Sequence, residues 1–303
     1  MLADLCSTIP QPPHVNGRPP MPLSDMAFAA ISKVYGGMSA RRSDSDVREN
    51  ASKGLTETDP HFNTVLKYLR SPKLTPVLRH LIEVSALPLK AVECDFAADS
   101  TGFSTCRFVR WYDHKWGRES TKREWVKLHA MTGVRTNIVT AVEISGWRSH
   151  DSHYFRPLVT TTAENFMLGD VTADKAYLSH ANLDHVEKFG GVPFIPFKTD
   201  NAAYRSDVPA TLPGIEGSAW DRMGHLFAYH REAFLTRYHQ RSNVETTFSM
   251  VKGKFGDSLR SKSDVGQINE VLCKVVAHNL CVLIASMYEL GLEAPAFAQA
   301  VNA

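Results

Sequence analysis

The sequence predicts an α/β protein in which a mixed β-sheet is flanked by helices and is preceded by an all-helical N-terminal region. Two observations lead to this prediction. Helix start and stop signals dominate residues 23–88, whereas short apolar runs separated by polar turns follow Pro88. Beyond residue 150, helical and strand-like segments alternate, which is the pattern of a sheet covered by helices.

Composition indicates a globular chain with a local basic region. The 303 residues are 43% hydrophobic and 22% charged, enough for one large domain or two smaller ones. A net charge of +2 excludes a whole-protein polyanion binder, so a nucleic-acid footprint must be local. Residues 237–262 carry such a footprint, with six Lys or Arg against two acids.

The cysteines and the most apolar segment bear on location. The five cysteines form no Cys-x-x-Cys pair and are odd in number, which argues against a disulfide framework and a zinc ribbon and favours a reducing cytoplasm. The apolar segment Val271 to Leu290 is interrupted by Lys274, His278 and Asn279. We therefore expect a buried helix there and no membrane association.

The N-terminal third is expected to be an extended arm followed by short helices. Residues 1–22 hold six of the sixteen prolines. Helices are predicted from Ser24 to Gly36, from Ser45 to Lys53, after Asp59-Pro60 and after Thr75-Pro76. These short helices fit either a helix-turn-helix that binds DNA or a plain helical bundle. The basic residues in this region are Arg41, Arg42, Lys67, Arg70 and Lys73.

The remaining elements follow from apolar periodicity. Strands are predicted at 92–99, 105–111, 125–132, 137–145, 166–174 and 192–197, with helices at 152–166 and 180–189. A long loop covers 198–217, and long helices cover 220–255, with a break near Arg237, and 265–291. The Trp and Tyr residues between Arg and Lys at 107–127 fit either DNA contact or the two sides of a strand.

Two acids follow apolar runs in matching contexts. Asp99 comes directly after the run from Val92 to Ala98, and Asp174 directly after the run from Phe166 to Ala173. If the two strands are neighbours in the sheet, both carboxylates lie at one rim, where Glu245 from a later helix would complete a three-carboxylate cage. Such a cage suits Mg²⁺ or Mn²⁺. Taken singly, each acid is more often a turn former or a helix cap.

A helical signature surrounds the third acid. Tyr238, Arg241, Glu245 and Lys252 follow one another at intervals of three, four and seven residues, so they return to within about 60° of one direction on a helix. Carboxylates bind hard cations and Arg and Lys bind phosphate oxygens, so this face suits a site for a metal and a phosphate. The simpler alternative is a solvated face with a local ion pair.

Together these motifs resemble the DDE transposases of bacterial insertion sequences, in the group with a Tyr-Arg-Glu-Lys signature. The resemblance covers roughly residues 23–290 and includes the strings Ala-Asp-Ser-Thr-Gly-Phe at 98–103, Thr-Ala-Asp-Lys-Ala-Tyr at 172–177 and Arg-Ser-Asn-Val-Glu at 241–245. It implies a ribonuclease H-like catalytic domain at 89–291, a helical DNA-binding region at 23–88, a Pro-rich arm at 1–22 and a tail at 292–303.

By position, the resemblance makes Asp99, Asp174 and Glu245 the catalytic residues and the ligands of two Mg²⁺ or Mn²⁺ ions. It makes Tyr238, Arg241 and Lys252 the DNA-binding residues. The resemblance also implies the protein's partners. These would be double-stranded DNA, as transposon terminal repeats and target, and a second copy of the chain when bound to DNA. The stretch Gly17-Arg18-Pro19-Pro20 is similar to a shortened Gly-Arg-Pro arm, which leaves open an internal or misassigned start at Met1.

The activity implied is that of a cytoplasmic DNA transposase. Metal-dependent hydrolysis at the transposon ends would be followed by attack of the freed 3′-hydroxyl on target DNA, without ATP or a covalent enzyme intermediate. Two alternatives remain at this stage. One is a ribonuclease H-like nuclease without strand transfer, and the other is a catalytically silent DNA-binding remnant of a transposase.

Overall fold

The chain forms two compact units. The structure, a computed structural model, describes residues 1–13, 16–17, 19–105, 115, 125–198, 217–295 and 297. What we call the helical unit comprises Met1–Pro88, Gly102–Leu128 and Ser249–Ala303, and the sheet unit comprises Leu89–Thr101 and His129–Phe248. The last part of the chain, which the sequence-based boundaries place with the sheet, thus groups with the N-terminal helices.

The N-terminal helices agree closely with the expected ones. They are α2 (Leu23–Gly36), α3 (Asp44–Ser52), α4 (Phe62–Leu69) and α5 (Leu74–Ala86), followed by the 3₁₀ turn η1 (Leu87–Leu89). The expectation of an extended arm over residues 1–22 is wrong at its start, where α1 (Leu2–Ser7) buries Leu5 and Cys6. Proline first occurs at position 10, so nothing in the first turns opposes a helix.

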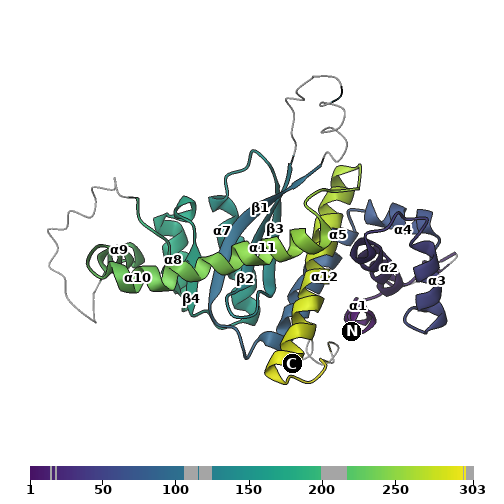
Figure 1. The fold of residues 1–303 in the computed structure, drawn as a ribbon, viewed down its shortest axis with the longest axis horizontal. Coiled ribbons are helices and arrows are strands. Elements are labelled where there is room, and N and C mark those ends of the chain that lie inside the picture. Colours follow the sequence, from purple (N-terminus) through teal and green to yellow (C-terminus); the bar gives the residue numbers. More distant parts are fainter. Residues whose placement is uncertain are drawn as a thin grey trace. The chain divides into compact units, whose positions relative to one another are not determined.

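The long C-terminal helix α12 (Asp264–Leu290) is the centre of the helical unit. It packs along α5, α2 and α4 (Figure 1), and its apolar side chains form much of the core there. Buried polar residues on α12 are hydrogen-bonded, as buried polar groups require: Asn279 donates to Ile82 O and Ser85 Oγ, at 3.3 and 2.9 Å. The helix is long and apolar enough to cross a bilayer, but 72% of its apolar window is buried inside the protein, as predicted for a core helix.

The sheet has five strands in the order β3-β2-β1-β4-β5. They are β1 (Phe96–Ser104), β2 (Trp125–Gly133), β3 (Val139–Gly146), β4 (Asp170–Ala173) and β5 (Val192–Phe194). Strand β4 runs parallel to both β1 and β5. Strand β1 is the central strand of the sheet, which explains why it begins with three fully buried residues, Phe96 to Ala98.

Strand β1 differs from the prediction at both ends. It begins at Phe96, four residues later than expected, and continues through Asp99 to Ser104, so Asp99 lies within a strand and not at its end. The residues before it serve as anchors: the carboxylate of Asp95 accepts the Asp170 N–H at 2.8 Å. The strand expected at 105–111 lies, apart from Thr105, outside the described residues.

The predicted hairpin between β2 and β3 is held by a buried acid. Glu93, only 3% exposed, accepts the backbone N–H of Thr136 at 2.5 Å and its hydroxyl at 2.6 Å. Gly133 makes this approach possible, because a Cβ at that position would lie 2.4 Å from Glu93 Cδ. The turn therefore depends on both residues, which are 40 positions apart.

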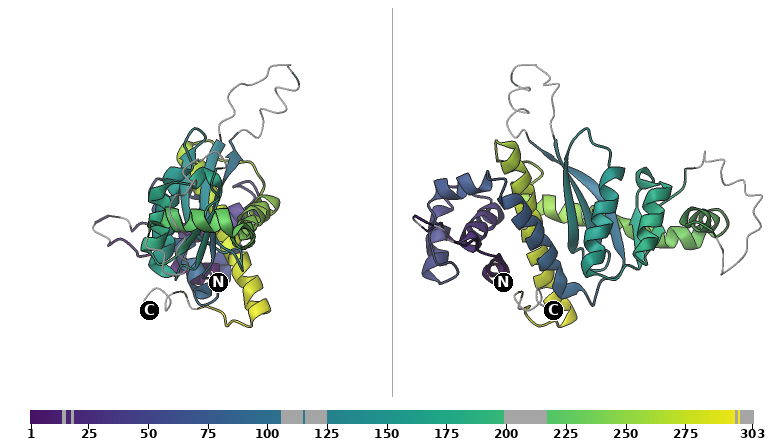
Figure 2. Two further views of the ribbon diagram at one scale, coloured as in Figure 1. Left: turned by 90° about the vertical axis from the view of Figure 1, so that its left-hand side faces the viewer. Right: turned by 180° about the vertical axis from the view of Figure 1, so that it is seen from behind.

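Helices cover both faces of the sheet, as predicted. Helix α7 (Ser152–Asn165) packs on β3 and α8 (His180–Lys188) on β5, while α10 (Arg231–Tyr238) packs on β4 and β5 from the opposite face (Figures 1 and 2). Helix α9 (Ala219–Tyr229) begins at a capping box formed by Ser218 and Asp221 and packs on α8 and α10. The long helix expected from residue 220 to 255 is therefore divided, first at His230.

Candidate active site

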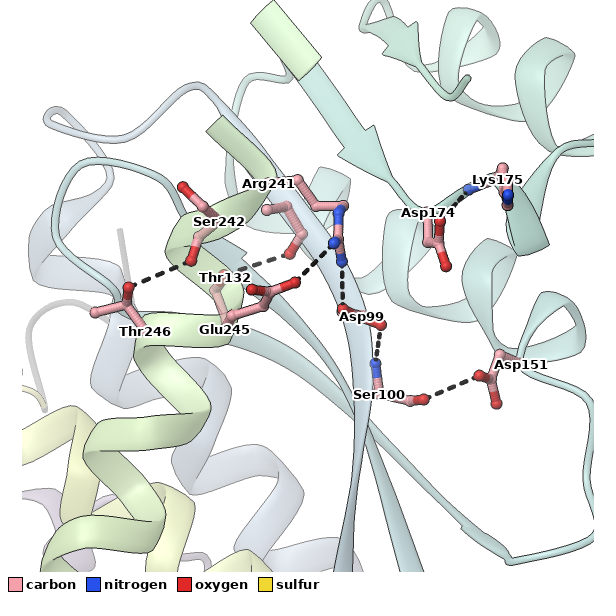
Figure 3. A network of polar contacts seen from close by, with 11 residues as sticks. Asp99, Ser100, Thr132, Asp151, Asp174, Lys175, Arg241, Ser242, Glu245 and Thr246 are labelled. Atoms are coloured by element: carbon pink, nitrogen blue, oxygen red, sulfur yellow. Dashed lines mark hydrogen bonds and ion pairs between the residues drawn. The ribbon is translucent and has the colours of Figure 1, made fainter. Parts of the chain in front are cut away.

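Strand register brings the first two acids together. Strands β1 and β4 are parallel, and their last paired residues are Ala98 and Ala173. Asp99 and Asp174 each follow directly, so both carboxylates emerge at the same edge of the sheet (Figure 3). The sequence-based expectation that these two acids share one rim is consistent with this register, although only Asp174 lies beyond the end of its strand.

Each of these acids also makes the local contact that the simpler alternative predicts. Asp99 Oδ1 accepts the N–H of Ser100 at 2.7 Å. Asp174 caps the 3₁₀ turn η2 (Lys175–Tyr177), with Oδ1 accepting the N–H of Lys175 at 2.7 Å. In each case Oδ1 makes the local contact, and Oδ2 of Asp99 is engaged separately by the guanidinium of Arg241.

Arg241 ties Asp99 to the third acid. Its Nη1 lies 2.6 Å from Asp99 Oδ2 and its Nη2 lies 2.6 Å from Glu245 Oε1 (Figure 3). Asp99 and Arg241 are each only 20% exposed in their side chains, whereas Glu245 is 57% exposed. One guanidinium therefore compensates two carboxylates, one of which is largely removed from water.

The pKa of Asp99 is shifted by burial and by the groups next to its carboxylate. Burial raises the pKa of Asp99 above its ordinary value, and the nearby charges of Asp174 and Glu245 raise it further. The Ser100 N–H and the Arg241 guanidinium oppose this shift without cancelling it. Burial disfavours the charge of Arg241, but Asp99, Tyr238 and Glu245 outweigh it, so the pKa of Arg241 rises. A further cation at this edge would relieve the remaining repulsion.

The signature residues do not lie on one uninterrupted α-helix. Tyr238 ends α10, the 3₁₀ turn η4 spans His239–Arg241, and Glu245 lies in α11 (Ser242–Phe255). A 3₁₀ turn has three residues per turn, so positions three apart are eclipsed. Tyr238 and Arg241 consequently remain on one side, with the guanidinium 6.0 Å from the ring centre.

Lys252 has its contacts in the helical unit. Its ammonium lies 5.6 Å from the centre of the Phe103 ring, and burial lowers the pKa of Lys252 while Asp257 raises it. On α11 it follows Glu245 by seven residues, so the two side chains leave the helix in directions about 20° apart. The structure thus keeps them on one helical face, and Lys252 contacts none of the three acids in the ion pairs of the described residues.

Sequence reasoning missed a second layer behind Asp99. Ser100 donates its hydroxyl to Asp151 Oδ2 at 2.9 Å, and Asp151 Oδ1 lies 3.8 Å from Nδ1 of the buried His129. His129 Nε2 in turn pairs with Ser145 Oγ at 2.8 Å, and its ring stacks on Tyr154. The position of Asp151 immediately before α7 is typical of a helix cap, yet its side chain makes no capping bond. Only the folded sheet reveals its proximity to Ser100.

The donor set at this edge fits a hard divalent cation. Its ligands would be carboxylate oxygens, and such a cation would offset the charges of Asp174 and Glu245, which add to the effect of burial in raising the pKa of Asp99. As the side chains stand, no three His, Cys, Asp or Glu residues in the described part of the chain are close enough to hold one ion. Arg241 instead supplies the positive charge between Asp99 and Glu245.

The comparison with known families decides the family. The family model described as the transposase DDE domain matches residues 90–280. This chain belongs to the DDE transposase family. No curated protein matches it.

Membership explains the architecture of this transposase. The mixed five-stranded sheet with helices on both faces and N-terminal helices before it is a ribonuclease H-like α/β fold, as predicted. The family implies DNA as the partner, and its members generally use divalent metal ions. The matched residues include Asp99, Asp174 and Glu245, the candidate acids of the sheet edge.

Proposed function

We propose that this transposase cleaves DNA at the ends of a mobile element and joins the freed ends to target DNA. The observation that carries the proposal is the convergence of Asp99 and Asp174 through strand register, with Glu245 tied to Asp99 by Arg241. We also propose that the chain belongs to the group of the family with the Tyr-Arg-Glu-Lys signature, which the spacing of Tyr238, Arg241, Glu245 and Lys252 supports.

In the proposed reaction, bonds at phosphorus are exchanged twice. Water attacks a phosphorus at the element's end, the bond to the 3′-oxygen breaks, and a 3′-hydroxyl and a 5′-phosphate result. The 3′-hydroxyl then attacks a target phosphorus and displaces another 3′-oxygen. The second step makes one phosphodiester bond and breaks one, so it requires neither ATP nor a covalent enzyme intermediate.

We assign Asp99, Asp174 and Glu245 as the residues that hold two Mg²⁺ or Mn²⁺ ions. When bound, the ions would activate the nucleophile and neutralise charge on the leaving oxygen. The protein's part is to hold the carboxylates: the Ser100 N–H orients Asp99, and the Lys175 N–H orients Asp174. Both bonds come from rigid backbone, which limits how far either acid can turn.

We assign Tyr238, Arg241 and Lys252 to the bound DNA. Arg241 and Lys252 carry charges suited to phosphate oxygens, and Tyr238 offers a ring and a hydroxyl beside Arg241. In-line displacement depends mainly on positioning and on charge neutralisation. The proposal therefore gives these three residues binding roles rather than proton-transfer roles.

Neutralising one acid at a time tests the assignment. Asp99→Asn, Asp174→Asn and Glu245→Gln should each lower Mg²⁺-dependent cleavage of terminal-repeat DNA by at least about 10³-fold, a loss of roughly 4 kcal/mol of transition-state stabilisation. DNA affinity measured in EDTA should stay within about threefold. Asp184→Asn, at an exposed acid on α8, is the matched control and should cut at the parental rate. A site variant that also cuts at the parental rate would remove that residue from the assignment.

A strand-transfer assay separates the alternatives. Incubation with terminal-repeat DNA, a target plasmid and Mn²⁺ should give joined products if the protein is a complete transposase. A nuclease would yield cut ends without joining, and a silent remnant would bind without cutting.

We also propose that the protein acts in the cytoplasm and that it binds DNA as a homodimer. Light scattering of the complex tests the homodimer and should give two chains per pair of ends.

A further inference from the structure

A basic pocket lies in the helical unit. It has a volume of about 610 Å³ and is formed by the ends of α2 and α4 and by the segment between α11 and α12. Four of its lining residues are cations, namely Lys33, Arg70, Arg260 and Lys262, and none of the described lining residues is acidic. Leu66, Leu69 and Leu259 contribute apolar surface to the lining.

Two consecutive buried residues of α12 hold the pocket's loops. The amide of Asn269 donates to Leu69 O and Ser71 O at 2.9 and 3.0 Å and so fixes the turn after α4 that carries Arg70. Glu270, 3% exposed, accepts the N–H groups of Arg260 and Ser261 at 2.9 and 2.8 Å. These bonds order the backbone that presents the cations before any ligand arrives.

The start of α12 completes the wall. A Cβ at Gly266 would lie 2.8 Å from Ser263 Oγ, which caps the helix, and 3.5 Å from Arg70 Cγ. Glycine thus avoids a clash with the capping hydroxyl of Ser263, while the stem of Arg70 lies at ordinary van der Waals distance from the first turn of α12. The Arg260 guanidinium is held in turn by the carbonyl of Gly37 at the end of α2.

The buried cation of the pocket is Lys33, which is 8% exposed. Burial lowers the pKa of Lys33, and its acidic neighbour Glu270 opposes that effect. Glu270 carries one negative charge against those of Lys33, Arg260 and Lys262, so it compensates only part of the positive charge of the pocket. A pocket with this balance attracts an anion.

We propose that this pocket binds phosphodiester groups of a DNA strand, at a site separate from the three acids. Four cations spread over three segments match a run of phosphates better than a single ion, and the apolar part of the lining suits deoxyribose. The inference rests on the proposed function only in taking DNA as the partner. It requires neither a metal ion nor Asp99, Asp174 or Glu245.

Salt-dependent DNA binding in EDTA tests the proposal without catalysis. Arg70 and Lys262 are exposed, so the double variant Arg70→Gln/Lys262→Gln should fold, and circular dichroism during heating would check this. Its affinity for a terminal-repeat duplex at 100 mM salt should fall about 10- to 100-fold. The slope of log affinity against log salt should shrink by about two, one for each lost phosphate contact.

The matched control removes the same charge elsewhere in the helical unit. Arg48→Gln/Lys53→Gln alters α3, where each cation already faces an acid four residues earlier. This variant should lose less than threefold in affinity and keep the parental slope within about 0.5. Equal losses in the two double variants would show a general charge effect and overturn the proposal.

A second measurement distinguishes a DNA strand from a free phosphate compound. Titration of the parent with dAMP and with inorganic phosphate should give dissociation constants weaker than about 1 mM, because one phosphate engages only part of the pocket. Tight dAMP binding that is lost in Arg70→Gln/Lys262→Gln, with DNA affinity unchanged, would overturn the proposal in favour of a nucleotide site. Neither the DNA affinity in EDTA nor the titrations depend on cleavage. A protein that binds DNA in this pocket but does not cleave it would therefore contradict the proposed function and leave this proposal standing.

Discussion

At the scale of single residues, the site is a compromise between burial and repulsion. Asp99 is held in a largely buried position beside two other carboxylates, and Arg241 offsets part of the cost. The raised pKa of Asp99 shows that its ionised form is disfavoured in the folded state. Functional sites commonly retain such costs, because removing them improves stability and abolishes activity.

Asp99→Asn should therefore stabilise the metal-free protein at neutral pH, by roughly 0.5–1 kcal/mol. The folded pKa of Asp99 lies above its ordinary value of 3.8, so its contribution to stability is present below that pH and is lost as pH rises through the folded value. Urea unfolding in EDTA at several pH values measures the difference between variant and parent. That difference should be absent near pH 3.8 and largest at neutral pH; a less stable variant at neutral pH would contradict this reading.

Behind Asp99, Asp151 acts on the orientation of Ser100. Asp151→Asn keeps the shape of the side chain but weakens the bond to the Ser100 hydroxyl. We expect cleavage to fall about 10-fold with DNA affinity unchanged, far less than for Asp99→Asn. The Ser100→Ala variant should show the same defect, and the double variant should add little to it. Strictly additive losses would mean that the two residues act independently.

At the scale of elements, the sheet edge depends on contacts between distant segments. The hairpin of β2 and β3 is anchored by Glu93, which belongs to the segment before β1. Two residues further on, Asp95 accepts the Asp170 N–H next to the β1–β4 pairing that places Asp99 beside Asp174. A substitution that disturbs the hairpin should therefore also disturb the positions of the candidate acids.

Gly133→Ala should destabilise the protein by about 1–3 kcal/mol, because the new methyl group would lie 2.4 Å from Glu93 Cδ. Thermal unfolding followed by circular dichroism measures the loss. Gly146→Ala, at a glycine where an added Cβ meets nothing within 4 Å, is the matched control and should cost less than about 1 kcal/mol. Equal effects at the two positions would show that the close approach to Glu93 is unimportant.

At the scale of the whole molecule, the compact units do not follow the order of the chain. Helix α12, at the end of the sequence, packs with α5 and α2 from its beginning. A fragment that begins at Leu89 would keep every candidate acid but expose the apolar side of α12. We expect the fragment 89–303 to aggregate or to lack a cooperative unfolding transition, as judged by light scattering and calorimetry. A monomeric fragment that unfolds cooperatively would contradict this view of the core.

Much of this could be predicted from the sequence, and the failures have physical causes. Local signals located most helices, because caps, glycines and prolines act on their own neighbours. The start of β1 is not predicted correctly, because residues 92–95 look strand-like but Glu93 and Asp95 bind partners 43 and 75 positions away. The 3₁₀ turn at His239–Arg241 and the contact of Asp151 with Ser100 likewise depend on tertiary packing that periodicity does not encode.

The most direct test of the central claim is the number of Mn²⁺ ions bound per chain on an uncleavable terminal-repeat DNA, measured by electron paramagnetic resonance. We expect two ions per chain in the parent and in Asp184→Asn. Each of Asp99→Asn, Asp174→Asn and Glu245→Gln should lose at least one ion. Unchanged occupancy in all three variants would contradict the assignment of these acids as the metal ligands.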